Sequence, residues 1–550
     1  MIGGTGLGCL RGGPAWARPE VVLGGIALLL GISLPGAGVR ASVVTGSLAD
    51  SVGFLDAHKG QTAIAALVCS LDRGDTLLAI DPSRRMIPGS NAKLFTTGSF
   101  LRRYGPSYRR DTVLLARGKA SLGDHGKKVR FKGDLVLRGS GMPDVYQILA
   151  PGSRGLLDSL AFLLKAQGLE KFEGTLWVDG SLFAPEPYGP GWAIDDLQYW
   201  YGAPVNAVMA NGNGATLSVT GTDHGAAIVF DPPETPLRVE STVTIGDSGA
   251  APRLDVARAP GSHVLQVTGT VPRGSMLRKQ VSVPDPDSAA AVVFLGAMRR
   301  AGIAVKADAR VLPPLGSTGK EEAKGIGPLY AADGGRSTAR TTSWKDVKRD
   351  RAASVLALAS PPTGDILGDV NAISMNAEAE ALLRLLDPAP SGKTRAGGLS
   401  QVMGWAARSG VDTLDLSLVD GSGLSPMDLV TPRAVVTWLT AMDRDSTVGT
   451  VFRGGLAKPG GLGTLHGRLG GLESGALVNA KSGTLSNVSA LSGYLTTAAG
   501  EHLVFSILSN GSRGSVTASK EAEDRLLLLL SRYRREAARP AWAPPFGIPR

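Results

Sequence analysis

Strand-like segments at the two ends of the chain bracket a long middle section, and this arrangement limits the folds that the chain can adopt. Strands that are distant in sequence can pair in one antiparallel sheet, so the middle of the chain is expected to be an insertion. A terminal helix predicted over 518–533 would cover this sheet. The predicted strands are 62–71 and 76–80 near the start, and 476–482, 490–496 and 503–508 near the end.

The composition supports several folded domains. The chain has 550 residues, of which 43% are apolar and only 19% charged, which suits buried cores rather than disorder. Strand-like runs broken by Gly, Pro and Asp predict a β-rich section between about 111 and 340, in which 156–167 is the one firmly helical pattern. Helical patterns return at 376–386, 399–409 and 432–442.

The N-terminal segment indicates export. Arg11 and Arg18 precede an apolar run of 14 residues, Val21 to Leu34, which is short for a membrane span of about 20 residues. Small or tolerated residues follow at Val39-Arg40-Ala41. The pattern predicts a signal peptide over 1–41 and a periplasmic or otherwise extracytoplasmic protein. An uncleaved signal anchor is the alternative.

The formal net charge of +10 favours anionic partners. Export argues against nucleic acid and leaves weak peripheral association with a membrane as an open alternative. The charged run 345–352 is expected to be solvated, with contact to an anionic polymer as its alternative.

Six scattered His and no H-E-x-x-H predict neither a metal nor a cofactor. Cys69, the only cysteine left after cleavage, is predicted to be a core residue.

Three short motifs occur in order along the chain. Ser90-Asn91-Ala92-Lys93 matches S-x-x-K, Ser374-Met375-Asn376 matches S-x-N, and Lys481-Ser482-Gly483 matches K-[ST]-G. Together they are typical of serine acyltransferases of the penicillin-binding and β-lactamase type. A second S-x-x-K match at Ser317 lies in a Pro/Gly-rich loop without a helical pattern, and we interpret it as a chance match.

The motifs supply the groups that this chemistry requires. A serine hydroxyl must lose its proton to a base, and the i, i+3 spacing places Lys93 beside Ser90. Burial and a nearby cation such as Lys481 can lower the pKa of that lysine. Ser374 can relay a proton to the leaving amine, and Asn376 can hold the substrate's peptide group. Lys481 can also pair with a terminal carboxylate, and Gly483 lets an extended substrate approach its strand.

The chain resembles the class C low-molecular-mass penicillin-binding proteins, the serine D-alanyl-D-alanine carboxypeptidase/endopeptidase family. The resemblance implies an α+β fold, in which a penicillin-binding/β-lactamase-like domain of antiparallel sheet and helices carries a large β-rich insertion of two domains. The segments that carry it include RRMIPGSNAKLFTT at 84–97, GDLVLRGSG at 133–141, NAISMNAEAEALLR at 371–384, DGSGLS at 420–425, GTLHGRL at 463–469 and AKSGTLSNVSALSGYL at 480–495.

The same resemblance implies a split catalytic domain, and the 284 residues between Ser90 and Ser374 leave room for the insertion. The expected boundaries are 1–41 for the signal peptide, 42–112 and 341–536 for the catalytic domain, 113–205 and 270–340 for inserted domain II, 206–269 for inserted domain III, and 537–550 for a Pro-rich tail.

Members of this family remove the terminal D-alanine of peptidoglycan stem peptides, often cleave D-alanyl cross-links, and are inhibited by β-lactams. The resemblance therefore implies these partners here, with the oligomeric state left open. It makes Ser90 the acylated nucleophile, Lys93 the base, and Ser374, Asn376 and Lys481 further catalytic groups. Substrate and oxyanion would be bound by Ser482, Gly483 and Thr484, and a loop near the cleft would be shaped by Asp420, Ser422 and Gly423.

Two departures and two alternatives accompany the resemblance. Met142 stands where the family has an aspartate, in a region whose acidic residue recognises a substrate amino group in some members. The third motif has serine in place of threonine, which keeps the hydroxyl.

A β-lactamase or esterase of the same fold would need a second base, and no E-x-x-L-N pattern supplies one. The intact motifs also argue against a non-catalytic protein that only binds peptidoglycan or β-lactams.

Overall fold

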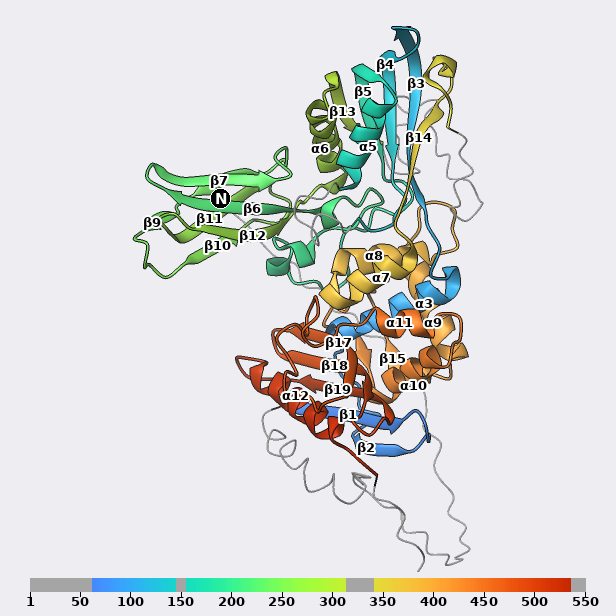
Figure 1. Cartoon of the computed structure of the whole chain (residues 1–550), viewed down its shortest axis with the longest axis vertical. Helices are drawn as coiled ribbons and strands as arrows, with labels where there is room; N and C mark the ends of the chain where they lie inside the picture. Colours follow the sequence, from blue (N-terminus) through green and yellow to red (C-terminus); the bar gives the residue numbers. More distant parts are fainter. Residues whose placement is uncertain (1–61, 145–154, 313–340, 536–550) are drawn as a thin grey trace, which may run out of the picture. The chain divides into compact units, whose positions relative to one another are not determined.

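The computed structural model describes residues 62–144, 155–312 and 341–535 (Figure 1). The predicted signal peptide, the chance match at Ser317 and the Pro-rich tail lie outside these ranges. No helix among the described residues is both long and apolar enough to cross a bilayer.

Strands from both ends of the chain form one five-stranded antiparallel sheet, as predicted. β1 (Ala63–Ser70) pairs along its length with β19 (His502–Asn510), although more than 430 residues separate them. The order in the sheet is β17-β18-β19-β1-β2, and Figure 1 shows the blue and red strands side by side. The remaining strands are β2 (Thr76–Ile80), β17 (Leu477–Leu485) and β18 (Val488–Thr496).

Alternate side chains of this sheet enter two separate cores. Ile64, Ala66 and Val68 pack with the leucines of α12 (Thr517–Ser531), whereas Ala65 and Leu67 face the helices on the other side. The two-residue period of a strand produces this division. Cys69 is half-buried against the second core. The helices on that side are α3 (Lys93–Tyr104), α7 (Thr363–Asp369), α8 (Asn376–Leu385), α9 (Arg395–Arg408), α10 (Pro432–Asp443) and α11 (Gly449–Gly454).

A second five-stranded sheet belongs to the middle of the chain, in the order β13-β5-β4-β3-β14. The predicted helix α5 (Leu156–Ala166) and a second helix, α6 (Pro286–Arg300), cover one face of it. The expectation of a single firm helix in this section was wrong. α6 is apolar over most of its surface and packs against both the sheet and α5, so it lacks a clear polar stripe. The strands are β3 (Asp111–Gly123), β4 (Lys128–Arg138), β5 (Leu169–Asp179), β13 (Ala304–Val311) and β14 (Ala353–Ala359).

Two small sheets enclose a separate core within the same section. One has the order β12-β6-β7, and the other is built on β11. Leu217, Val219, Leu265 and Val267 meet between them. The alternation of buried and half-buried residues along β6 is typical of a sandwich whose sheets have one face on the core. The strands are β6 (Gly214–Thr222), β7 (Gly225–Asp231), β8 (Arg238–Ser241), β9 (Thr244–Gly246), β10 (Arg253–Ala257), β11 (Val264–Pro272) and β12 (Met276–Ser282).

Strand pairing suggests different domain boundaries from those expected. β12 pairs with β6, although the boundaries expected from the sequence place residues after 270 in domain II. β14 pairs with β3, although residues after 341 were assigned to the catalytic domain. A strand shares a domain with its hydrogen-bonded neighbours, so we propose that domain III extends to 282 and domain II to 359.

Candidate active site

Ser90 and Lys93 lie where a 3₁₀ turn, η1 (Gly89–Ala92), leads into α3. Gly89 has a positive φ of 51°, which redirects the chain into the helix at little steric cost because glycine has no Cβ. Asn91 donates a hydrogen bond of 2.9 Å to Ser492 Oγ on β18. The first motif is therefore fastened to the central sheet, and Ser90 remains only half-buried.

The Lys93 side chain is completely buried and directed at the serine. Its Nζ donates to Ser90 Oγ at 3.0 Å, to the backbone oxygen of Ser422 at 2.6 Å and to Oδ1 of Asn376. Burial lowers the pKa of Lys93 to about 8, although four buried carboxyls oppose the shift. A lysine with this pKa is partly neutral near pH 8 and can accept a proton from the serine.

The S-x-N motif joins Lys93 at the start of α8. Ser374 ends a π-helical turn, η6 (Val370–Ser374), with a φ of 72°. This left-handed conformation is unusual for a residue with a side chain, and such strain concentrates at functional sites. Asn376 accepts from Lys93 and donates at 2.8 Å to the backbone oxygen of Tyr201. Asn376 thus links the lysine to the middle section of the chain.

The K-S-G motif lies on β17, the edge strand next to η1. Lys481 is fully buried, and burial together with the nearby charge of Lys93 holds its pKa well below the usual range. A Cβ at Gly483 would come within 2.5 Å of the Pro88 oxygen and 3.0 Å of the Ser90 nitrogen. The glycine is thus required for packing the Ser90 turn on the strand, a reason that the sequence did not indicate.

The loop at 420–425 packs against Lys93 and supplies one of the oxygens that accept its hydrogen bonds. The buried Asp420 carboxylate accepts from the backbone nitrogens of Ser422, Gly423 and Ser425 at 3.0, 2.6 and 2.9 Å. It also accepts from Trp192 Nε1 at 2.9 Å. These contacts hold the Ser422 carbonyl that receives Lys93, so the predicted role in shaping the loop is confirmed.

Sequence reasoning missed the buried carboxyls near Lys93. Glu378 and Glu380 on α8 are fully enclosed, and burial raises the pKa of each to about 7. Glu380 accepts at 2.6 Å from the nitrogen of Gly421, so it fastens the 420–425 loop to α8. Asp428 is also buried and its pKa is raised. The available signal was the pair of acids among the alanines and leucines that follow Asn376.

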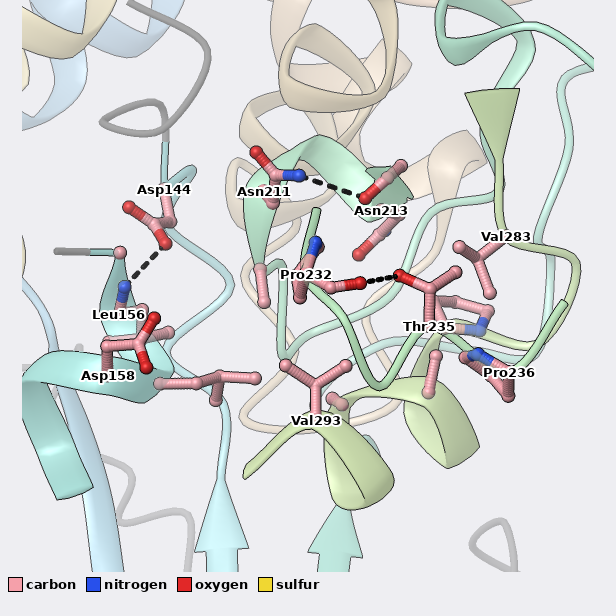
Figure 2. A pocket seen from close by; sticks show the side chains of 17 residues that line it. Asp144, Leu156, Asp158, Asn211, Asn213, Pro232, Thr235, Pro236, Val283 and Val293 are labelled. Atoms are coloured by element: carbon pink, nitrogen blue, oxygen red, sulfur yellow. Dashed lines mark hydrogen bonds between the residues drawn. The ribbon is translucent and has the colours of Figure 1, made fainter. Parts of the chain in front are cut away.

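The Met142 side chain is only 3% exposed and packs in the core, although the residue also lines a pocket together with Pro143 and Asp144. Asp144, the nearest acid, is also buried and accepts at 2.7 Å from the Leu156 nitrogen at the start of α5 (Figure 2). The substitution at 142 is thus accommodated inside the protein. The small cavity in Figure 2 contains no residue of the three motifs.

Thr464, in the GTLHGRL segment, connects the third motif with the η6 turn that ends at Ser374. Its Oγ1 accepts at 2.7 Å from Ser482 Oγ, and its nitrogen donates at 3.0 Å to the Ala372 oxygen. Gly463 permits this approach, because a Cβ there would lie 2.1 Å from the same oxygen.

Thr464→Val is expected to lower the second-order rate constant for acylation by benzylpenicillin about fivefold, because Ser482 loses one hydrogen bond of about 1 kcal/mol. Thr464→Ser keeps the hydroxyl and should restore the rate. The effects of Thr464→Val and Ser482→Ala should not add, since both remove the same contact. Equal rates for the valine and serine variants would show that the hydroxyl does not position Ser482.

The described residues contain no cluster of His, Cys, Asp or Glu able to hold a metal ion. The site described above consists of hydroxyls, amines, an amide, buried carboxyls and backbone groups. A profile of the D-Ala-D-Ala carboxypeptidase 3 (S13) family matches residues 53–312 and 330–533. The chain belongs to this family. It is a serine peptidase of the D-Ala-D-Ala carboxypeptidase type, with the α+β penicillin-binding fold that the motifs indicated.

The sequence similarity to known S13 relatives extends over most of this chain. A D-alanyl-D-alanine carboxypeptidase of Actinomadura sp. (strain R39) is 29% identical over 84% of this chain and 79% of its own. The D-alanyl-D-alanine carboxypeptidase DacB of Haemophilus influenzae is 27% identical over 90% of this chain and 92% of its own. The crystal structure of penicillin-binding protein 4 from the same organism superposes with a TM-score of 0.66 at 23% identity, covering 87% and 99% of the two chains.

Proposed function

We propose that the chain is a D-alanyl-D-alanine carboxypeptidase and endopeptidase that acts through an acyl-enzyme on Ser90. The observation that carries this proposal is the buried amine of Lys93, 3.0 Å from Ser90 Oγ, with a pKa of about 8. A nucleophile and a base in hydrogen-bond contact are the central requirement of serine acyl transfer.

In the proposed mechanism, Ser90 Oγ attacks the carbonyl carbon of the penultimate D-alanine, and its proton passes to Lys93 Nζ. The oxyanion is stabilised by the backbone N–H groups of Ser90 and Thr484. The peptide bond then breaks, and Ser374 relays the proton to the nitrogen of the leaving D-alanine. Water hydrolyses the ester, Lys93 again accepts the proton, and Ser90 is regenerated.

Substrate binding is assigned to the remaining motif residues. Lys481, on the edge strand, pairs with the terminal carboxylate, and Ser482 and Thr484 bind it or the adjoining peptide. Asn376 holds the substrate amide with its carboxamide group, which is oriented by its hydrogen bonds to the Tyr201 oxygen and to Lys93. Peptidoglycan stem peptides and cross-links are the proposed substrates, in an extracytoplasmic location. β-Lactams are the proposed inhibitors, since the related Haemophilus influenzae protein has been crystallised with one.

The test is the intact mass of the protein after incubation with benzylpenicillin, beside Ser90→Ala. A stable adduct on the wild type alone, together with release of D-alanine from a peptide ending in D-alanyl-D-alanine, is the expected result. Consumption of the antibiotic without D-alanine release would instead indicate a β-lactamase. If no adduct forms and neither compound is consumed, the proposed activity is rejected, and the chain is then a non-catalytic binding protein.

A further inference from the structure

The sheet of β13, β5, β4 and β3 has one face that its helices do not cover. Helices α5 and α6 pack against the other face. On the uncovered face, a small apolar cluster around Leu115, Val136 and Trp177 occupies one part of the sheet. Beyond it, toward the β3–β4 hairpin, most side chains on this face are charged, and the uncharged Ser121, Thr175 and Ala304 lie among them.

Strand register arranges these charges in two adjoining rows. In one row Lys119, Lys132, Glu173 and Lys306 lie side by side on four strands. In the next row Arg130 lies beside Lys171. We call Lys119, Arg130, Lys132, Lys171 and Lys306 the lysine-rich face; it holds five cations and, in Glu173, one anion.

Most of these cations are uncompensated. Glu173 pairs with Lys171 at 2.5 Å, and that contact, followed by the charges of Lys132 and Lys306, lowers the pKa of the carboxyl. Lys119, Arg130, Lys132 and Lys306 are exposed and form no ion pair with another residue in the described ranges. By contrast, the row on the other side of Lys119 and Lys132 has no excess of cations: Arg117 is paired with Asp134 at 2.7 Å, and the exposed Asp308 lies in the same row.

The charged run predicted from the sequence lies along the edge of β3, where Trp344 and Val347 pack into the core on the helix-covered face. The Gly118 nitrogen donates at 2.9 Å to the Lys348 oxygen, which places the run beside Lys119. Its basic residues, Lys345, Lys348, Arg349 and Arg351, are all exposed. They outnumber Asp346 and Asp350, so this edge adds positive charge to that of the sheet.

We propose that the lysine-rich face and the adjoining 345–351 segment bind the surface of an anionic phospholipid bilayer. A sheet spaces its side chains about 4.8 Å apart across strands and about 7 Å along them, in a broad array. Such an array matches a flat surface of phosphates. A single linear polyanion would instead be expected to bind along a groove. The two rows contain no aromatic ring for stacking on nucleic-acid bases. Lys and Arg side chains near a bilayer are attracted to the negative surface potential of anionic lipids.

The test uses the purified chain and sedimentation with vesicles of phosphatidylcholine, with or without phosphatidylglycerol. Wild-type protein should sediment only with the anionic vesicles and be released by high salt. The combined variant Lys119→Gln, Lys132→Gln, Lys306→Gln should lower the partition coefficient about tenfold or more. A matched control, Arg408→Gln, Arg444→Gln, Arg513→Gln, removes three exposed cations elsewhere and should change it less than twofold.

Benzylpenicillin acylation, measured on all three proteins, should be unchanged, which separates vesicle binding from folding and from the active site. Equal loss of binding in both variants would show an unspecific charge effect and overturn the proposal. The proposal would also be overturned if the wild-type protein did not bind anionic vesicles. Binding of soluble polyphosphate without binding of vesicles would overturn it too, because the partner would then be a thread-like polyanion.

Discussion

Lys93→Ala is expected to lower the rate constant for acylation of Ser90 by benzylpenicillin about a thousandfold, within the range attributed to a positioned general base. The variant removes the amine that lies 3.0 Å from Ser90 Oγ. The measurement is the rate of adduct formation by intact mass, corrected for the folded fraction.

Lys393→Ala is the matched control for the loss of a buried lysine. Burial lowers the pKa of Lys393 to about 8 as well, but its Nζ donates to the backbone oxygens of Asp387 and Ala389. This variant should lose stability and keep the acylation rate of its folded fraction. Similar losses of rate in both variants would mean that Lys93 acts through stability rather than as a base.

The pH dependence follows from the same group. The pKa of Lys93 is lowered to about 8, and only the neutral amine can take the serine proton. Acylation should therefore rise about tenfold per pH unit below pH 8 and level off above it. Lys393→Ala should keep this profile and Lys93→Ala should lose it. A rate that is flat between pH 6 and pH 8 in the wild type would contradict the assignment of Lys93 as the base.

Gly423→Ala is expected to lower the free energy of unfolding by about 3 kcal/mol and to reduce acylation at the same time. A Cβ at this position would lie 1.9 Å from the Gly89 oxygen, and the residue has a φ of 75°. Overpacking and left-handed strain each cost about 1–3 kcal/mol. Relief of the clash must move the turn that carries Ser90, so both stability and activity should respond.

Denaturant unfolding and benzylpenicillin acylation check this expectation beside Gly454→Ala. Gly454 lies in α11 without a positive φ, and nothing would lie within 4 Å of its new Cβ. That variant should be neutral or slightly stabilising, because alanine favours the helix. If Gly423→Ala is as stable and active as Gly454→Ala, the 420–425 loop does not hold the Ser90 turn in the way described.

Local patterns were sufficient for the elements that border the site. The predicted helices at 376–386 and 432–442 correspond closely to α8 and α10, and the terminal strands to β1, β2 and β17 to β19. These segments have a marked apolar period or begin at a turn, and both signals lie within a few residues. α6 was missed because a helix enclosed on most sides carries no polar face to reveal its period.

The sequence by itself determined the family, the order of the motifs and the pairing of the chain ends, because each depends on residue types at short spacing or on repeated strand patterns. Only the tertiary structure decided how the site is held. Lys93 meets Asn376 and Ser422, and Gly423 meets Gly89, across some 280 to 335 residues of chain. The pKa of Lys93 likewise depends on burial by distant segments. No local pattern carries such contacts, because packing between remote segments creates them.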